Sequence, residues 1–272
     1  MILVTGAYGL LGSWLCFRHQ KDTIGLSHEE LDITNPYDID HAINLYKPDA
    51  VINCAGMVKN PKVSEYFAFE GTNGKAPHYI QEVCDTKGIK LVAVSTDCVF
   101  SGDRGNYTEE DAPDPQDNYG FYKMQGEITD NPHLTVRTSF VGWPDPSMRG
   151  LLAWLFVNSS PSLPGYINAL WNGMTVVSLA EYLVELAYSR HTGIMHLYGQ
   201  TISKYELLRT AAAAFPRYEK EVYPVDDPKI DRTLSSVRSD RPYLPGTSNF
   251  EEQMRTMAAL EKEFHKWERG RE

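Results

Sequence analysis

The strand, glycine loop and helix at the start of the chain constrain its fold more than any other feature. A short apolar run over residues 1–5 leads directly into Gly6, Gly9 and Gly12, and helix-compatible residues 13–19 follow. Glycine permits a tight turn here and lets the backbone approach a bound pyrophosphate. The free N–H groups and dipole of the next helix favour phosphate charge. This pattern therefore predicts a dinucleotide-binding unit.

Short apolar runs alternate with helical stretches through the first half of the chain. The predicted strands are residues 1–5, 23–26, 49–55, 90–95 and 134–138, and the predicted helices are 13–19, 37–46, 74–87 and 118–130. This alternation is typical of βαβ units with right-handed crossovers, so we expect an α/β fold with a doubly wound, Rossmann-like parallel sheet.

The pattern changes after about residue 139, where prolines and tryptophans become frequent. Further helices are predicted at 177–188, 205–215 and 250–267, and a further strand at 194–198. We expect a cofactor-binding domain over 1–138, to which a segment near 174–196 returns. A smaller substrate-binding subdomain is expected over 139–173 and 197–272.

Composition narrows the class of partner. The chain has 272 residues and a net charge of −10, with 42% hydrophobic and 23% charged residues. A protein that coats nucleic acid or an anionic membrane needs a basic footprint, so neither partner is expected. A small anionic ligand held by a few local donors remains compatible with this charge.

The four cysteines, Cys16, Cys54, Cys84 and Cys98, form no C-x-x-C pair and match no zinc spacing. We therefore expect buried thiols in a reducing compartment and no metal site. There is also no uninterrupted apolar run of about 18 residues, so no membrane span is predicted. These observations together predict a cytoplasmic protein.

The glycine spacing G-x-x-G-x-x-G, preceded by Thr5, resembles that of the extended short-chain dehydrogenases/reductases. The second predicted strand ends near Ser27 and His28, with no acidic residue at its tip. An acid there would bind the adenosine ribose hydroxyls and repel a 2′-phosphate. Its absence favours NADP(H), although Glu29 and Glu30 lie just beyond and keep NAD(H) open.

Tyr119 and Lys123 form a Y-x-x-x-K pattern on a predicted helix. Residues four apart share a helix face, so the two side chains are expected to be neighbours. A free phenol has a pKa of about 10, and a neighbouring ammonium is expected to lower it. We interpret the two residues as a catalytic pair, although a solvated helix pair also fits and Tyr122 precedes Lys123 as well.

A third candidate group, Ser95-Thr96-Asp97, follows the fourth predicted strand. Ligands in open parallel sheets bind beyond the carboxyl ends of the strands. A hydroxyl at this position can hydrogen-bond the carbonyl oxygen of a substrate, and Thr96 is our candidate. The alternative is that one of these residues caps a turn, a role that Ser95 or Asp97 can fill.

Together these motifs resemble the dTDP-4-dehydrorhamnose reductase family across most of the chain. The segments that carry the resemblance are Ser95-Thr-Asp-Cys-Val-Phe-Ser-Gly102, Tyr119-Gly-x-x-Lys123 with Gly126-Glu127, Val136-Arg137-Thr138-Ser139, Asn53-Cys54-Ala55-Gly56 and Asn73. The sequence departs from the family where Phe140 replaces a tryptophan and where Cys98 replaces an aromatic residue. The family's C-terminal R-P-x-N-S-x-L pattern is also missing.

The resemblance implies reduction of the 4-keto group of a nucleotide-activated 6-deoxy sugar, in deoxysugar and polysaccharide precursor biosynthesis. It implies that Tyr119 protonates the alkoxide, that Thr96 shares this hydrogen bond and that Lys123 positions the cofactor. The residues expected at the cofactor are Gly6, Tyr8, Gly9, Leu10, Gly12, Ser27, His28, Asp32, Ile33, Ala55, Gly56, Asn73, Tyr119 and Lys123. Those expected at the nucleotide-sugar substrate are Lys59, Thr96, Asp97, Phe140, Arg149, Trp171 and Asn172, with Lys62 as a further candidate.

Three alternatives stay open at this point. Nucleotide-sugar dehydratases usually carry Glu where this chain has Cys98, which argues against dehydration. Epimerases share the Tyr–Lys pair. A non-catalytic NADP-binding subunit, like that of methionine adenosyltransferase, would also keep this fold. The nucleotide, the sugar and a homodimeric state are left undecided.

Overall fold

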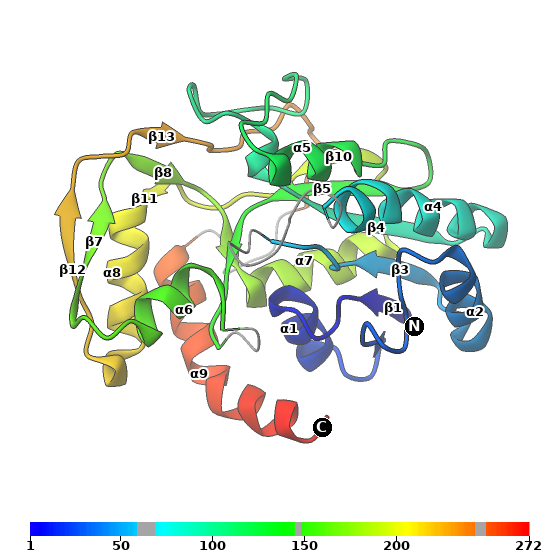
Figure 1. Cartoon of the computed structure of the whole chain (residues 1–272), viewed down its shortest axis with the longest axis horizontal. Coiled ribbons are helices and arrows are strands. Elements are labelled where there is room, and N and C mark those ends of the chain that lie inside the picture. Colours follow the sequence, from blue (N-terminus) through cyan, green and yellow to red (C-terminus); the bar gives the residue numbers. More distant parts are fainter. Residues whose placement is uncertain (59–68, 145–147, 243–248, 272) are drawn as a thin grey trace.

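A parallel sheet forms the centre of the computed structural model, which describes residues 1–58, 69–144, 148–242 and 249–271 (Figure 1). The strand order of this six-stranded sheet is β10-β5-β4-β3-β1-β2. Its strands are β1 (Ile2–Thr5), β2 (Thr23–Gly25), β3 (Ala50–Asn53), β4 (Lys90–Thr96), β5 (Leu134–Thr138) and β10 (Gly193–His196). The order reverses between β1 and β3, which is where ligands bind in doubly wound folds. The predicted fold class is confirmed.

Helices cover both faces of the sheet. Helices α1 (Leu10–Arg18) and α7 (Val176–Tyr188) lie on one face, and α2 (Pro36–Tyr46), α4 (Ala76–Lys87) and α5 (Asn118–Gln125) lie on the other. Side chains alternate accordingly along β1, where Ile2 and Val4 pack in one core and Leu3 packs in the other. This alternation explains why the strands read as continuous apolar runs in the sequence.

Two helix ends differ from their predicted positions. Helix α1 begins at Leu10, inside the glycine loop, rather than at residue 13. Helix α5 ends at Gln125 rather than near residue 130. Its C-cap residue, Gly126, lies so close to the backbone of Asn73 that a side chain on Gly126 would overlap the Asn73 carbonyl.

Small sheets and short helices make up most of the second half. Its elements are β6 (Phe140–Val141), α6 (Gly150–Val157), β7 (Ser162–Tyr166), β8 (Ala169–Trp171), β9 (Met174–Thr175), β11 (Ile202–Ser203), α8 (Lys204–Ala214), η3 (Pro216–Tyr218), β12 (Glu221–Val225) and β13 (Ile230–Asp231). The strands pair as β11-β8-β13, β12-β7 and β6-β9. The predicted residue limits of a substrate subdomain stay a prediction.

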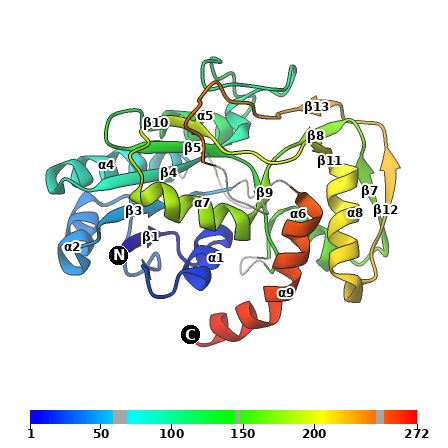
Figure 2. The same ribbon diagram turned by 180° about the vertical axis from the view of Figure 1, so that it is seen from behind.

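The last helix, α9 (Phe250–Arg269), returns to the first half of the chain (Figure 2). Its Phe264 ring stacks on the Trp14 ring of α1, with centroids 4.2 Å apart. Gln253 in α9 also accepts a hydrogen bond from the backbone of Thr175, at 2.9 Å. These contacts hold the end of α9 beside the glycine loop.

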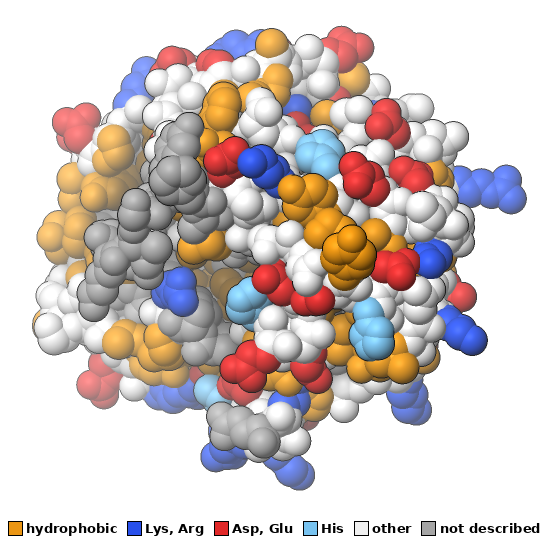
Figure 3. Space-filling model, turned by 45° about the vertical axis from the view of Figure 1, so that its right-hand side comes forward, with side chains coloured by type: hydrophobic (Ala, Val, Ile, Leu, Met, Phe, Trp, Pro, Cys, Tyr) orange, Lys and Arg blue, Asp and Glu red, His pale blue; other side chains and the backbone are white. Residues whose placement is uncertain are grey.

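The surface reflects the acidic composition. Figure 3 shows acidic side chains scattered among hydrophobic and uncharged ones on one face of the molecule. No helix in the described ranges is long and apolar enough to cross a membrane. All four cysteines are free thiols: Cys16 and Cys84 are buried, whereas Cys54 and Cys98 are half-buried.

Candidate active site

The glycine loop is pressed against the end of β3. Gly6 has a φ of +66°, and a Cβ at this position would lie 2.6 Å from the Ala55 Cα atom. The Thr5 hydroxyl donates to the Asn53 side-chain oxygen at 2.6 Å and ties the ends of β1 and β3 together. Gly12 also packs on the backbone of Gly6 without room for a side chain. Both glycines are therefore required by close backbone contact.

The start of helix α1 has the features of an anion site. Its N-cap residue, Gly9, provides no side chain to bond the first N–H groups of the helix. Among the residues that the structure describes, a Cβ on Gly9 would meet only the Gly6 carbonyl oxygen, at 3.3 Å, which leaves the other side of the loop free of described atoms. The first N–H groups of a helix have no partner within the helix and, with the dipole, attract phosphate. The loop thus fits the pyrophosphate of a dinucleotide.

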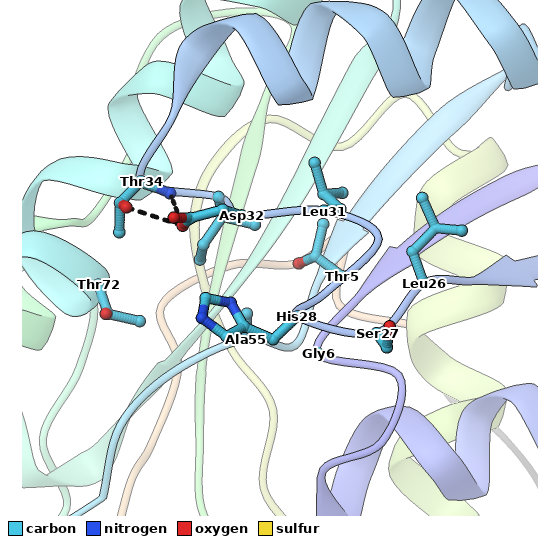
Figure 4. A pocket seen from close by; sticks show the side chains of 11 residues that line it. Thr5, Gly6, Leu26, Ser27, His28, Leu31, Asp32, Thr34, Ala55 and Thr72 are labelled. Atoms are coloured by element: carbon cyan, nitrogen blue, oxygen red, sulfur yellow. Dashed lines mark hydrogen bonds between the residues drawn. The ribbon is translucent and has the colours of Figure 1, made fainter. Parts of the chain in front are cut away.

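A pocket of about 100 Å³ lies beside this loop (Figure 4). It is lined by Thr5, Gly6, Leu26, Ser27, His28, Leu31, Asp32, Ile33, Thr34, Ala55 and Thr72. Five of the residues predicted to bind cofactor outside the glycine triplet line it: Ser27, His28, Asp32, Ile33 and Ala55. Its mainly apolar wall suits a flat base, with polar groups at its margin.

Asp32 has a local structural role in the pocket wall. Its carboxylate accepts hydrogen bonds from the backbone N–H and the hydroxyl of Thr34, at 2.9 and 2.7 Å (Figure 4). These two bonds hold the pKa of Asp32 below its ordinary value. The residue is therefore a turn-forming aspartate that shapes the pocket.

An acidic side chain does fold back to the tip of β2. The Glu30 carboxylate accepts a hydrogen bond from the Ser27 backbone N–H at 2.7 Å, and the Ser27 hydroxyl accepts one from the Glu30 N–H at 3.2 Å. The bonds to Ser27 lower the pKa of Glu30. This reciprocal pair was not predicted from the sequence, which placed both glutamates beyond the tip.

Thr96 and Tyr119 meet at the carboxyl end of β4. Thr96 precedes the short helix η2 (Asp97–Val99), and its hydroxyl accepts from the Cys98 N–H at 3.1 Å. The same hydroxyl donates to the Asp97 carboxylate at 3.1 Å, and it lies near enough to the Tyr119 phenol to act on the pKa of that group. Thr96 itself is therefore the turn cap, a role that the sequence analysis gave to Ser95 or Asp97.

Helix α5 brings Tyr119 to this position. Asp117 caps the helix by accepting from the Gly120 N–H at 2.9 Å. Gly120 lies so close to the Cys98 carbonyl that any side chain there would overlap it. The Tyr119 ring packs edge-on against Phe69, with centroids 6.2 Å apart. Close packing of α5 on η2 thus fixes the phenol beside Thr96.

The pKa of Tyr119 differs from the expectation. Burial raises it, Cys98 acts in the same direction, and the hydrogen bond with Thr96 only opposes the rise. Lys123 is not among the described groups that act on this phenol, so the predicted lowering of its pKa by the ammonium is wrong. Burial is the largest influence on this phenol, and the Lys123 ammonium donates to the Val94 carbonyl.

Lys123 reaches from α5 under the end of β4. Its ammonium donates to the Val94 carbonyl oxygen at 2.7 Å. Burial lowers the pKa of Lys123 to about 8, although Glu127 opposes this change. A Cβ on Gly56 would lie 3.9 Å from the Lys123 Nζ atom. The amine therefore faces the small residues that follow β3.

Asn73 shapes that same segment. Its side-chain oxygen accepts from the Met57 N–H at 2.8 Å, and its side-chain nitrogen donates to the Met57 carbonyl at 2.9 Å. Asn73 lies in the π-helix η1 (Glu70–Lys75), a rare form that is frequent at functional sites. The asparagine predicted at the cofactor thus holds the backbone beside Gly56 in place.

The residues predicted to bind the substrate differ in burial, and two of them lie outside the described ranges. Lys59 and Lys62 lie outside the described residues. Arg149 is exposed at the start of α6, and Phe140 is half-buried at the start of β6. Their assignment to the substrate remains a prediction.

Trp171 and Asn172 are buried and bonded within the protein. The Trp171 indole N–H donates to the Ser139 hydroxyl at 2.8 Å. The Asn172 amide exchanges hydrogen bonds with the backbone of Leu234, at 2.8 and 2.9 Å. These bonds fix both side chains within the protein, and their assignment to the substrate remains a prediction.

Lys204 and Arg232 stand near the catalytic strand end and were missed from the sequence. The Lys204 Nζ atom lies 5.1 Å from the centre of the Trp171 ring. Burial lowers the pKa of Lys204, while Asp97 acts to raise it. Arg232 donates to the Phe100 carbonyl at 3.0 Å. A helix start at Lys204 is signalled by the Ser203–Glu206 capping box, but its place beside Asp97 has no local signal.

The model of the RmlD substrate binding domain family matches residues 1–154. The chain belongs to this family. This result confirms the resemblance to dTDP-4-dehydrorhamnose reductases that the motifs indicated.

Curated relatives of this RmlD-family chain include several reductases. A probable low-salt glycan biosynthesis reductase of Haloferax volcanii is 35% identical over 162 residues, which cover 51% of this chain and 52% of that protein. A dTDP-4-dehydrorhamnose reductase of Mycobacterium tuberculosis is 28% identical over 248 residues, or 79% of this chain and 81% of that protein. Mouse methionine adenosyltransferase 2 subunit beta is 30% identical over 138 residues, or 46% of this chain and 41% of that protein.

Solved structures show the same fold over nearly the whole chain. A dTDP-4-dehydrorhamnose reductase of Clostridium acetobutylicum has a TM-score of 0.80 at 24% identity, covering 95% of this chain and 98% of that one. One of Bacillus anthracis, in complex with NADP, has a TM-score of 0.76 at 22% identity, covering 94% and 97%. Together with the family match, the reductase relatives identify an NAD(P)H-dependent oxidoreductase that acts on a keto group.

Proposed function

We propose that the protein reduces the 4-keto group of a nucleotide-activated 4-keto-6-deoxy sugar with NADPH, in deoxysugar or polysaccharide precursor biosynthesis. The observation that carries the proposal is the placement of Tyr119 beside Thr96 at the end of β4, with Lys123 facing the segment after β3. The names of the reductase relatives support this substrate class.

The chain has the groups that a nicotinamide dinucleotide needs. The open glycine loop at α1 fits the pyrophosphate, and the pocket next to it fits the adenine. The glycine after Ala55 leaves space in front of Lys123, whose ammonium can donate to ribose hydroxyls. When bound, the reduced cofactor supplies the hydride that converts the keto carbon to a carbinol. The NADP complex of the Bacillus anthracis neighbour supports NADP(H), with NAD(H) as the alternative.

Tyr119 acts as the proton donor in this proposal. Because burial raises its pKa, the phenol remains protonated at neutral pH and has a proton to give. Reduction of a ketone requires one proton on the carbonyl oxygen, and a hydrogen-bonded acid can supply it in the transition state. Thr96 lies beside Tyr119, and its hydroxyl can share the developing negative charge on that oxygen.

Lys123 supports the acid through its position. Its ammonium lies under the end of β4 and faces the segment after β3, where it can hold the cofactor beside Tyr119. Lys204 and Arg232 add positive charge near Asp97, on the side where the second half of the chain faces the site. An anionic nucleotide sugar is therefore attracted to this side despite the net charge of −10.

A regulatory subunit is the second candidate, because the mouse methionine adenosyltransferase subunit matches the chain over 138 residues. That function needs the fold but not the proton donor. The position of Tyr119 beside Thr96 therefore favours catalysis.

The decisive test is oxidation of NADPH by the purified full chain in the presence of dTDP-4-keto-6-deoxyglucose and its UDP, GDP and CDP counterparts. We expect loss of the reduced-nicotinamide absorbance with at least one of them. The matched control is the same nucleotide sugar with a 4-hydroxyl, which should give no signal. Failure with all four ketosugars would refute the proposal, and isomerised sugar without net oxidation of NADPH would identify an epimerase.

A further inference from the structure

The side chain of Arg271, just after α9, lies on the glycine loop. Its Nη1 atom donates to the Ala7 carbonyl oxygen at 3.0 Å. Its guanidinium carbon lies 3.9 Å from the centre of the Tyr8 ring and 4.6 Å from that of Trp267. Arg271 is therefore distant from the glycine loop in sequence but lies against it in the structure.

The same guanidinium reaches the tip of β2. Its Nη2 atom lies 3.4 Å from the place that a Cβ on Gly25 would take, and its charge acts on Glu30. In Rossmann-like folds the adenosine ribose lies between the first glycine turn and the end of the second strand. Arg271 therefore touches both elements that border the ribose.

Most of the donors on Arg271 are uncommitted. A guanidinium carries five N–H donors. Within the described part of the chain, its side chain makes the one hydrogen bond to Ala7 and has no ion pair with a carboxylate. Planar N–H pairs of arginine match the geometry of phosphate oxygens. The group is therefore charged, preoriented by ring stacking and able to bind an anion.

We propose that Arg271 recognises the 2′-phosphate of NADPH and gives the enzyme its preference over NADH. This inference rests on the proposed function, since it assumes a nicotinamide dinucleotide in the site. It supplies the cation that is missing from the tip of β2 in the sequence. Glu30, the acid at that tip, is held by the Ser27 N–H and stands opposite this charge.

The placement of Arg271 depends on the docking of α9. Phe264 and Trp267 in this helix pack against Phe17 of α1, with ring centroids 5.5 and 5.6 Å apart. Arg271 follows two residues after the helix ends at Arg269. A purely structural reading is that Arg271 anchors the end of α9 by stacking on Tyr8. The two roles predict different cofactor affinities.

The test is equilibrium titration of the full chain with NADPH and NADH, read by nicotinamide fluorescence, for the unaltered protein, Arg271→Ala and Arg271→Lys. In Arg271→Ala we expect the Kd for NADPH to rise about 10- to 100-fold, as for loss of a charged hydrogen bond. The Kd for NADH should change less than about threefold, within the ordinary spread of such contacts. Arg271→Lys should keep part of the preference, because it retains the charge without the planar donor pair.

Arg269→Ala is the matched control, since this exposed arginine lies in the last turn of the same helix. It should leave both Kd values unchanged. Titration with 2′,5′-ADP and with 5′-AMP repeats the comparison without the nicotinamide. We expect Arg271→Ala to weaken only the 2′-phosphorylated nucleotide.

Equal weakening of NADPH and NADH in Arg271→Ala would overturn the inference and leave a structural anchor. An unaltered protein that prefers NADH would overturn it as well, whereas the proposed reductase would stand. Binding of neither cofactor by the unaltered protein would instead refute the proposed function. If Arg271→Ala fails to fold in a urea titration, Arg271→Lys decides the question: a reduced preference for NADPH supports the inference, and an unchanged preference overturns it.

Discussion

The cofactor side of the candidate site is built from the glycine loop and the ends of β1, β3 and β4, which adjoin one another in the sheet. The proposed substrate side, by contrast, would be assembled from Phe140, Trp171, Lys204 and Arg232, which come from separate segments. On the cofactor side, close backbone contacts determine the geometry, because glycines allow contacts that side chains would prevent. On the second side, hydrogen bonds between distant residues hold the wall. The cofactor side is therefore marked by a local sequence pattern, whereas the proposed substrate side is marked by almost none.

The largest expected effect separates chemistry from cofactor binding on the first side. Tyr119→Phe removes the phenol hydroxyl but keeps the ring that packs against Phe69. Loss of a positioned general acid is expected to lower turnover about 100- to 10,000-fold. The Kd for NADPH should stay within about twofold, since the hydroxyl belongs to the proton-transfer step. Steady-state kinetics and fluorescence titration measure the two quantities.

Tyr122→Phe is the control for this change, because Tyr122 also precedes Lys123 but is buried in α5. It should retain most of the turnover. If Tyr122→Phe is inactive and Tyr119→Phe is active, the acid has been assigned to the wrong tyrosine.

The second prediction concerns the buried ion pair between Glu127 and Arg137, which supports the cofactor side. The Glu127 carboxylate accepts from Arg137 at 2.7 and 2.8 Å and from the Ser95 hydroxyl at 2.7 Å. The side chains of this pair are 3% and 6% exposed, so Glu127→Gln leaves a buried charge on Arg137 without its partner. The expected cost is about 3–5 kcal/mol in the free energy of unfolding. Urea denaturation followed by circular dichroism measures it.

Replacing both partners by apolar residues of similar volume should cost less than Glu127→Gln alone, because no unpaired charge remains. The double variant Glu127→Leu/Arg137→Met tests this order. Equal destabilisation by the two variants would mean that packing, rather than charge pairing, accounts for the loss.

Much of the cofactor side could be predicted from the sequence because its signals are local. The apolar runs gave the strands of the central sheet, and the glycine spacing marked the loop at α1. Y-x-x-x-K and Ser-Thr-Asp marked Tyr119 and Thr96, which the sheet and α5 bring together. In each case the chemistry follows from a few neighbouring residues and from the rule that ligands bind at strand ends.

The remaining features depend on contacts between residues far apart in the sequence. Arg271 meets Ala7 because aromatic packing docks α9 on α1, and Lys204 lies near Asp97 because the start of α8 packs on the Trp171 ring. The pKa of Tyr119 was mispredicted because burial cannot be inferred from helix spacing. Such contacts have no periodic or spacing pattern that reveals them beforehand.

The third prediction tests whether the proposed substrate side can be altered without any change in cofactor binding. Asn172→Ala removes the two hydrogen bonds that hold the backbone of Leu234. Leaving these buried groups unpaired is expected to cost about 1–3 kcal/mol in the free energy of unfolding. We expect the KM for the nucleotide sugar to rise while the Kd for NADPH is unchanged. Asn168→Ala, at an exposed bond to Asp226, is the control.

An equal loss of cofactor and substrate affinity in Asn172→Ala would contradict this separation. It would mean that the two sides share one structural support. The substrate side could then not be altered independently of the cofactor side.

The smallest effect concerns the charge of Lys123. Burial lowers its pKa to about 8, so its ammonium is lost as the pH rises through that value. The high-pH limb of kcat/KM is therefore expected near pH 8, with a fall of at most about tenfold per pH unit. Burial holds the pKa of Tyr119 above its ordinary value, so the phenol does not produce this limb. A pH series of initial rates at low substrate concentration measures it.

Lys90 provides the matched control, because burial also lowers its pKa to about 8 while its ammonium bonds the Leu186 and Ser189 carbonyls away from the site. Lys90→Met should leave the limb in place.

Both lysines have folded pKa values below their unfolded ones, so the unfolded chain binds more protons above pH 8. Their contribution to stability therefore rises with pH between about 8 and 10.4, and unfolding does not explain a decline in kcat/KM there. A limb that vanishes in Lys90→Met, or that coincides with loss of the circular dichroism signal, would show that Lys123 is not the titrating group.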